Sequence, residues 1–370
     1  MRQELRPTKH YNMMDYLNKA ASRTMSSLPF NELDNLLLSC FAYLPLKGIV
    51  PEFPGPAREG ITIREAAKRF FAEHPARELL RGDVFMVPVY RMFSRMAKSR
   101  RFGHAVLNNL LGIDDDELRE HFGAIEIRTG DGVRYISYRG SDSSLDGWKE
   151  SFSIVCGTIP SEVRAANYLN ETQRRDDAPI RTGGHSKGGH LAVFAAANCE
   201  PEIADRIVRV YSNEAPGFLR GVYETEGFLR IKDRISRYIV ESSVIGQVLD
   251  FMKDPVIVKS SAKGFLQHDA FTWNVDLKKS MFMLADSTDK KSRRFKKAFD
   301  EWIEDISVGD RKILINDIFY ALERRKLQSF TQKKGVFLTV LYLILDFPKY
   351  HRSTRDAVFL LANRYLTGEA

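Results

Sequence analysis

The sequence has few cysteines, and no hydrophobic run that is long enough to cross a membrane. Its 370 residues include three cysteines, and no two of them have the spacing of metal ligands: they are Cys40, Cys156 and Cys199. We therefore expect neither a disulfide framework nor a zinc site, which fits a reducing compartment. The longest apolar run, Val336–Leu345, is too short for a bilayer-spanning helix and predicts a buried helix near the C-terminus.

The N-terminal segment Met1–Leu17 lacks the apolar core of a signal peptide. Internal repeats and low-complexity tracts are also absent from the chain. From these absences we expect a soluble, cytoplasmic protein.

No zinc finger, RNA-recognition motif or helix-turn-helix pattern accompanies the basic clusters of the chain. The net charge is +8, and the excess gathers in Arg91–Arg101, Lys290–Lys297 and Arg324–Lys334. Such clusters can bind nucleic acid or anionic membranes, but they are more often a solvated basic face. Without a recognition motif we expect no nucleic-acid partner, while an anionic membrane surface stays open as a partner.

Apolar residues are plentiful enough for a large core. They make up 44% of the chain and include 24 phenylalanines, which argues against global disorder. The length suits one large domain with additions. The pattern of predicted helices and strands divides the chain into an N-terminal helical region (1–121), a core (122–276) and a C-terminal helical extension (277–370).

Helical patterns dominate both ends of the chain. Residues 30–46 have helical apolar spacing, with Asn31 or Ser27 as the N-cap. A second helix starts near Thr62, which forms a capping-box pattern with Glu65. Beyond residue 276 only helical patterns occur, and they predict helices over 295–306, 311–325 and 334–345.

Between these ends the sequence alternates strands and helices. Residues 124–128 and 134–138 alternate in polarity around a Thr-Gly-Asp-Gly turn, which predicts a hairpin. The segments that follow predict a helix over 188–198 and strands over 180–182, 207–212, 235–240 and 255–259. This alternation predicts an α/β fold with a mostly parallel sheet and helices on both faces.

The strongest chemical signal is the segment Gly184-His185-Ser186-Lys187-Gly188, which matches the pattern G-x-S-x-G. A predicted strand precedes it, and a helix rich in small residues follows. A serine at such a turn is held in a strained conformation with its hydroxyl exposed, and the helix N-terminus points at a developing oxyanion. We therefore predict Ser186 as a nucleophile. The plainer alternative is a serine that caps a helix.

A second signal lies upstream, where Tyr138-Arg139-Gly140-Ser141-Asp142 closes a predicted strand. A Gly–Ser turn there can present the backbone N–H of Ser141, and the N–H of Lys187 can complete an oxyanion hole. Alternatively, this segment is an ordinary loop in which Ser141 or Asp142 caps the next helix.

At these two motifs the chain resembles the class 3 lipases, which have an F-R-G-T/S turn and a G-H-S-x-G elbow. It is also similar to a group of uncharacterised bacterial lipase-like hydrolases. The segments that carry this second resemblance are the opening helix, Asn213–Phe218 (NEAPGF) and Gln267–Trp273 (QHDAFTW). The resemblance covers residues 30 to about 276, and it implies an α/β-hydrolase fold and a carboxylic ester, or a lipid, as substrate.

The resemblance selects His268 as the general base, and chain order supports this choice. In α/β-hydrolases the order is serine, acid, histidine. Only His190, His268 and His351 follow Ser186, and His190 lies on the elbow helix, about one turn beyond the nucleophile. His351 lies in the C-terminal extension, so His268 remains, with a surface-loop histidine as the alternative interpretation.

The acid departs from the class 3 pattern, because Ser243 stands at the position of the family's aspartate. Nearby carboxylates are Glu214, Glu241, Asp250 and Asp254. Glu214 and Glu241 both follow the carboxyl ends of predicted strands, the edge where parallel-sheet sites assemble. We favour Glu214, because its strand should neighbour that of Ser186. The alternative is that Glu214 is a loop carboxylate that accepts hydrogen bonds from backbone N–H groups.

Together these features predict an α/β-hydrolase core with an N-terminal helical cap and a C-terminal helical extension. The predicted reaction is ester hydrolysis through an acyl-enzyme on Ser186, and it calls for no metal or organic cofactor. The alternative is an inactive hydrolase-like scaffold that binds a partner, nucleic acid or an anionic membrane through its basic face.

Overall fold

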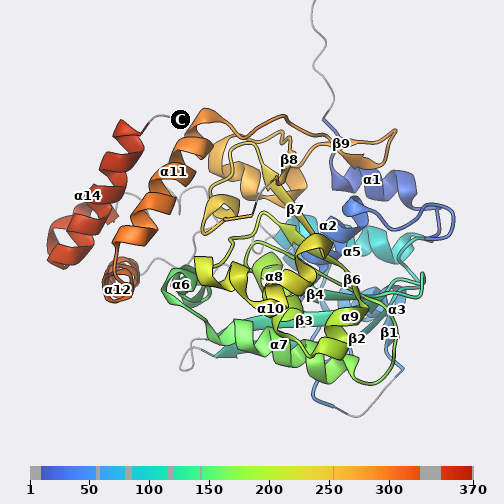
Figure 1. Ribbon diagram of the computed structural model, residues 1–370. Helices are drawn as coiled ribbons and strands as arrows, with labels where there is room; N and C mark the ends of the chain where they lie inside the picture. The colour runs from blue at the N-terminus through green and yellow to red at the C-terminus, as the bar shows by residue number, and fades with distance from the viewer. Residues whose placement is uncertain are drawn as a thin grey trace, which may run out of the picture.

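The computed structural model of the chain describes residues 10–55, 59–79, 86–115, 120–141, 144–252, 254–325 and 343–368. In these residues eight strands form one sheet whose order follows the sequence (Figure 1). The strands of this sheet are β1 (Ile61–Thr62), β2 (Val106–Asp115), β3 (Glu120–Arg128), β4 (Arg134–Tyr138), β5 (Ile180–His185), β6 (Ile207–Asn213), β7 (Ile235–Val240) and β8 (Val256–Val258). The short strands β9 (Val275–Asp276) and β10 (Met281–Phe282) pair with each other.

Two kinds of pairing divide the large sheet. Strands β1 to β4 pair antiparallel, and β3 and β4 form the predicted hairpin, in which Arg128 pairs with Arg134. From β4 to β8 every pairing is parallel, so the chain must return across the sheet between strands. The carboxyl ends of β4 to β7 therefore meet at one edge.

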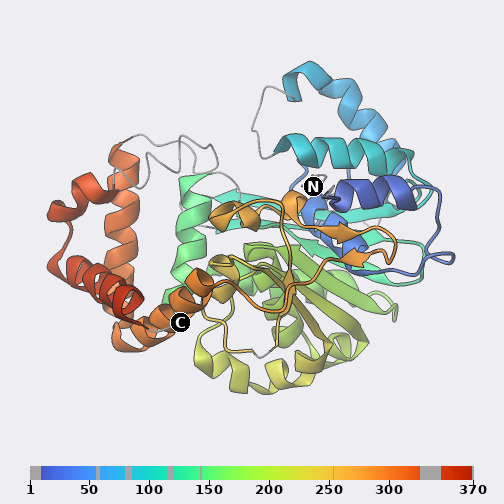
Figure 2. The same cartoon turned by 90° about the horizontal axis from the view of Figure 1, so that it is seen from above.

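Helices cover both faces of the sheet (Figure 2). The helices before the hairpin are α1 (Met13–Ala20), α2 (Glu32–Phe41), α3 (Ile63–Glu73), α4 (Ala76–Leu79) and α5 (Met86–Lys98). Those between strands are α6 (Leu145–Ser153), α7 (Pro160–Gln173), α8 (Lys187–Asn198), α9 (Pro201–Arg206) and α10 (Glu226–Ile231). Helices α1, α2 and α5 bury one apolar cluster against the sheet, and α7 and α8 bury a second cluster on the opposite face. This three-layer arrangement is the α/β-hydrolase fold that the sequence predicts.

The N-terminal region contributes strands as well as helices. Helix α2 begins after Asn31, whose side chain accepts hydrogen bonds from the first turn, and α3 begins after Thr62 in the same way. Strands β1 and β2, however, belong to the main sheet, and β2 pairs with β3. The expected boundary at residue 121 therefore falls inside the sheet. The segment 106–115 has no clear alternation of polar and apolar residues, because the pairing of β2 with β3 shifts register between Asn108 and Leu111.

The C-terminal extension packs beside one end of the core. Its described helices are α11 (Lys290–Asp305), α12 (Val308–Arg324) and α14 (Arg352–Thr367). Trp302 and Phe299 of α11 pack with Ile154 and Ile159 of the core in a third apolar cluster. The helix expected over 334–345 lies for the most part outside the described residues. Strand β10 is an exception to the expectation that only helices follow residue 276. In the part of the chain that the structure describes, no helix is long and apolar enough to span a membrane.

Candidate active site

Ser186 stands at a sharp turn between β5 and α8. Its backbone has φ 57° and ψ −132°, a conformation that residues other than glycine rarely adopt. The strain is held in place from the neighbouring strand, because the N–H of Ser186 donates to the carbonyl of Asn213 (3.0 Å). Ser186 is partly exposed, whereas the residues on both sides of it are buried. This is the geometry of a nucleophile elbow.

The glycines of the elbow allow two segments to touch. A Cβ on Gly184 would lie 2.2 Å from the carbonyl carbon of Gly188, and one on Gly188 would lie 2.2 Å from the carbonyl oxygen of Tyr138. Both neighbours are backbone atoms that cannot turn aside. The helix that follows the serine is therefore pressed against the end of β4.

Replacing Gly188 with alanine is expected to destabilise the fold by at least about 3 kcal/mol, at the upper end of overpacking costs. The new methyl group would collide with the carbonyl of Tyr138. Urea unfolding of the purified variant measures the loss. Gly221→Ala is the matched control, because its Cβ would meet no atom within 4 Å. Equal stability of the two variants would contradict the close contact.

A buried network of polar side chains between α2 and β6 supports the elbow. The side-chain amide of Asn213 donates to the carbonyl of Gly184 (2.9 Å) and to Ser39 Oγ (3.0 Å). Its carbonyl oxygen accepts from Asn35 Nδ2 (2.9 Å). Asn35 and Ser39 lie one turn apart on α2, and both are fully buried. Sequence reasoning missed these roles, and the only signals were two polar residues at positions i and i+4 in the apolar part of α2 that follows Glu32 and Asp34.

His268 lies beside the elbow. It ends a short 3-10 helix (Gly264–His268), and His185, the residue before Ser186, contacts it directly. The Nε2–H of His185 donates to the carbonyl of His268 (2.8 Å), and the two ring centroids are 4.8 Å apart. The loop that carries the predicted base is thus fastened to the strand that carries the predicted nucleophile.

Burial, with a smaller contribution from the nearby His268, lowers the pKa of His185 from its ordinary value to about 3. His185 therefore stays neutral and acts as a hydrogen-bond donor to the His268 loop. This contact gives His185 a structural role, in which it holds the His268 loop against the elbow.

The low pKa of His185 predicts a loss of stability in acid. Between the unfolded value near 6.5 and the folded value of about 3, only the unfolded chain binds the proton. The free energy of unfolding is therefore expected to fall by about 1.4 kcal/mol for each unit of decreasing pH in this range from this group alone. Urea unfolding at several pH values measures the slope. His185→Gln should show a smaller slope, and an unchanged slope would contradict this origin.

Glu214 is the carboxylate that the structure brings to His268. Its Oε1 lies 3.9 Å from His268 Nδ1, a distance that an ion pair spans but a hydrogen bond does not. The residue follows β6, has φ 46° and is 1% exposed. In the part of the chain described, His268 Nδ1 is buried without a hydrogen-bond partner, so a small approach of the two groups would complete a bond.

Ser243 holds this carboxylate in place. Its hydroxyl donates to Glu214 Oε1 (2.7 Å), and the backbone N–H groups of Val240 and Gly246 also donate to the carboxylate (3.1 and 3.3 Å). Ser243, which stands at the expected aspartate position, thus donates a hydrogen bond to the carboxylate of Glu214, a residue that follows the neighbouring strand β6. An aspartate there would instead place two negative charges together.

The other carboxylates that the sequence put forward lie in different surroundings. Asp250 forms a buried ion pair with Arg237. Glu241 accepts a hydrogen bond from Asp289 N through its backbone carbonyl (2.7 Å). Among the described residues, no ion pair or hydrogen bond links His268 to Glu241 or to Asp254.

The end of β4 and the start of α8 frame the space beside Ser186. A Cβ on Gly140 would lie 2.6 Å from the carbonyl oxygen of His185, so the turn before Ser141 touches the elbow. Lys187 is the first residue of α8, where backbone N–H groups have no acceptor within the helix. The hydroxyl of Ser141 is hydrogen-bonded to Ser151 of α6. Asp142 lies outside the described residues.

Comparison with known proteins places the chain in a family. The model of the Mbeg1-like family matches residues 96–320, more than half of the chain. The chain belongs to the Mbeg1-like family. No curated protein matches it in sequence. Among solved structures, that of M37 lipase is similar at 12% identity, with a TM-score of 0.33, over 60% of this chain and 69% of the other.

The Mbeg1-like match covers the elbow, Glu214 and His268, and it continues through α11 and most of α12. The remaining histidines after the elbow have partners of their own. His190 Nε2 lies 2.7 Å from Glu162 Oε1, and His351 pairs with Asp317 in the exposed extension. In the described parts of this Mbeg1-like chain, no group of three or more histidine, cysteine or acidic side chains is arranged to hold a metal ion.

Proposed function

We propose that the chain is a serine hydrolase that cleaves carboxylic esters through an acyl-enzyme on Ser186. Membership in the lipase-like Mbeg1-like family supports a hydrolase as the general class. The observation that carries the finer proposal is the meeting of three groups at one sheet edge. These are the strained Ser186, the His268 loop fastened to the elbow, and the buried Glu214 beside His268 Nδ1.

In the proposed reaction, Glu214 fixes the tautomer of His268. With Nδ1–H turned toward the carboxylate, Nε2 is free to take the proton of the Ser186 hydroxyl as the oxygen attacks the ester carbonyl. The positive charge that forms on the imidazole is stabilised by Glu214. His268 then gives its proton to the leaving alcohol, and water, activated by the same nitrogen, hydrolyses the acyl-enzyme.

The backbone N–H groups of Lys187 and Ser141 are the proposed donors to the oxyanion. The contact between the β4 end and the first turn of α8 supports this assignment, because it brings both backbone segments to the nucleophile. Fixed donors of this kind stabilise charge that develops only in the transition state, so they raise the rate rather than the affinity.

An ester with an apolar acyl chain is the proposed substrate class. The ring of Phe265 stacks on His268 at 5.8 Å between centroids, and Phe265 and the adjacent Leu266 are 44% and 56% exposed. Exposed apolar side chains beside a reacting centre favour an apolar substrate group.

A covalent serine probe tests the proposal directly. The folded protein is expected to react with a fluorophosphonate at one site, mapped to Ser186 by mass spectrometry, and to hydrolyse p-nitrophenyl esters faster as the acyl chain lengthens from acetyl to octanoyl. A folded protein that neither reacts with the probe nor hydrolyses any ester of the series would overturn the proposal and favour the scaffold alternative.

A further inference from the structure

The side chain of Lys187 is buried, although the residue follows the nucleophile directly. Only 1% of it is exposed, and its Nζ donates to Glu150 Oε2 (2.6 Å) and to the carbonyl of His121 (2.7 Å). A lysine buried beside a carboxylate is costly to place in a protein, so its position calls for a physical reason.

Glu150 lies on α6 and is also 1% exposed. Its carboxylate does more than pair with Lys187, because it also accepts from the backbone N–H of His121 and of Ser161 (both 3.2 Å). The carboxylate therefore joins four elements: β3, α6, the first turn of α7 and the first residue of α8. All of its contacts are with groups whose positions are fixed by the sheet or by a helix end.

Helix α6 follows the turn that contains Ser141, and a second contact joins them. Ser151, one residue after Glu150, is hydrogen-bonded to Ser141 Oγ. Lys187 and Ser141 thus both attach to consecutive residues of one helix. These are the two residues whose backbone N–H groups are the proposed oxyanion donors.

We propose that the Lys187–Glu150 ion pair is a positioning device for the oxyanion hole: it ties Lys187 to α6, to which Ser141 is bound through Ser151, and so sets the separation of the two backbone donors. This inference rests on the proposed function. The side chains of Lys187 and Glu150 touch no substrate atom in this role, and they act through the backbone N–H groups of Lys187 and Ser141. A misplacement of about 1 Å at a reacting centre can cost about 10²-fold in rate, which is the size of effect expected here.

The test removes the ion pair without leaving a buried charge. The double variant Lys187→Met/Glu150→Gln replaces both groups with neutral side chains of similar size, and the glutamine keeps an acceptor for a backbone N–H. Its kcat for an ester, per site titrated with a fluorophosphonate, is expected to fall by about 10²-fold while KM changes little. Affinity for an alkyl boronic acid, whose adduct occupies the oxyanion hole, should fall in parallel with kcat.

Glu150→Asp is the second variant, in case the double variant does not fold. It keeps both charges but shortens the link by one methylene group, and it should lower kcat by about 10-fold with KM unchanged. Cooperative thermal unfolding of each variant establishes that the protein measured is folded.

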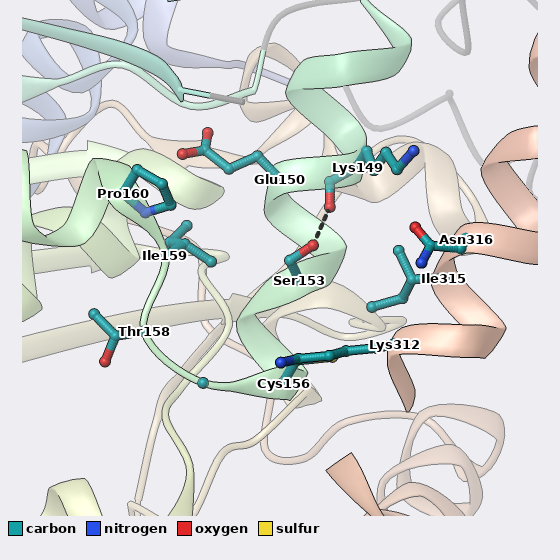
Figure 3. A pocket seen from close by; sticks show the side chains of 11 residues that line it. Lys149, Glu150, Ser153, Cys156, Thr158, Ile159, Pro160, Lys312, Ile315 and Asn316 are labelled. Carbon is teal, nitrogen blue, oxygen red and sulfur yellow. Dashed lines mark hydrogen bonds between the residues drawn. The ribbon is translucent and has the colours of Figure 1, made fainter. Parts of the chain in front are cut away.

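A matched control lies on the same helix. Figure 3 shows Lys149 pointing toward Asn316 of α12, whereas Glu150 points toward Pro160 at the start of α7; both line a cavity of about 410 Å³. Lys149 Nζ pairs with Glu323 at 3.6 Å, and Glu323 is largely exposed. Lys149→Met/Glu323→Gln removes an ion pair from α6 on this other side, and it should change kcat by less than about twofold.

The outcomes separate the positioning role from the proposed function. Wild type that reacts with the probe and hydrolyses esters, beside folded variants with unchanged kcat and boronate affinity, would overturn the positioning role alone. A loss of total activity that disappears when the rate is divided by the number of titrated sites would also overturn it, since it would reflect only the amount of folded protein. An inert wild type would overturn the proposed function, and the positioning role with it.

Discussion

Ser186→Ala is expected to lower the turnover of a hydrolysable ester by at least about 10⁴-fold, because nothing else at the elbow can form the acyl-enzyme. The fold should be unaffected. Alanine keeps the Cβ atom of serine, so the backbone strain at φ 57° is the same in both proteins. Steady-state kinetics on the purified variant measures the loss, with circular dichroism and urea unfolding as checks of structure.

The same kinetic measurement on a variant of His268 tests the proposed base. His268→Ala is expected to lose about as much activity as Ser186→Ala, and the double variant should lose little more, because the two residues act as a unit. Ser153→Ala is the control variant: Ser153 lies on α6, and among the described residues its hydroxyl donates to the carbonyl of Lys149 alone. Residual turnover in Ser186→Ala near that of the control would rule out an acyl-enzyme on this residue.

Glu214→Gln is expected to lower kcat by about 10³-fold. Glutamine is almost identical in shape, but it cannot stabilise the imidazolium, and its amide can reverse the tautomer that His268 needs. The hydrogen bonds from Ser243 and from the N–H groups of Val240 and Gly246 favour an acceptor at this position, so some loss of stability should accompany the loss of rate.

Glu241→Gln is the matched comparison, because Glu241 was the other glutamate at a strand end. It should retain nearly full activity, since its side chain makes no described contact with His268. A large loss of turnover in Glu241→Gln alone would identify it as the acid. Near-full activity in both variants would mean that neither glutamate serves His268.

The sequence predicted those parts of the fold and site that depend on local pattern. The hairpin turn, the elbow glycines and the strand–helix alternation all leave signals within a few residues. The neighbouring positions of β5 and β6, which led us to favour Glu214, followed from the rule that consecutive strands usually lie side by side. Strand β2 was not predicted, because its polar and apolar residues do not alternate clearly across the register shift between Asn108 and Leu111.

Other features of the site depend on partners far apart in the chain, which no local pattern reveals. Lys187 appeared in the motif only as a backbone donor, because nothing near it in sequence marks Glu150, 37 residues away, as its partner. Asn35 and Asn213 meet across 178 residues. Ser243 looked like the loss of an acid, and only the fold revealed that it donates to the carboxylate of Glu214.

The sequential order of the strands has a consequence for how the chain matures on the ribosome. Each strand of the large sheet pairs with the strand made just before it, so the sheet can grow as the polypeptide emerges, without waiting for distant segments. Helix α2 is synthesised early, but the hydrogen bond from its residue Asn35 to Asn213 can form only after Asn213 has emerged.

The residues of the site therefore arrive in a fixed order. Ser186 and Glu214 take their places while His268 is still unsynthesised, and the His268 loop can dock on His185 only after β8 has been added to the sheet. We expect the nascent chain to carry an assembled but unactivated serine until the last part of the core is complete. In the proposed mechanism, reactivity would then begin only after His268 has been synthesised and its loop has reached His185.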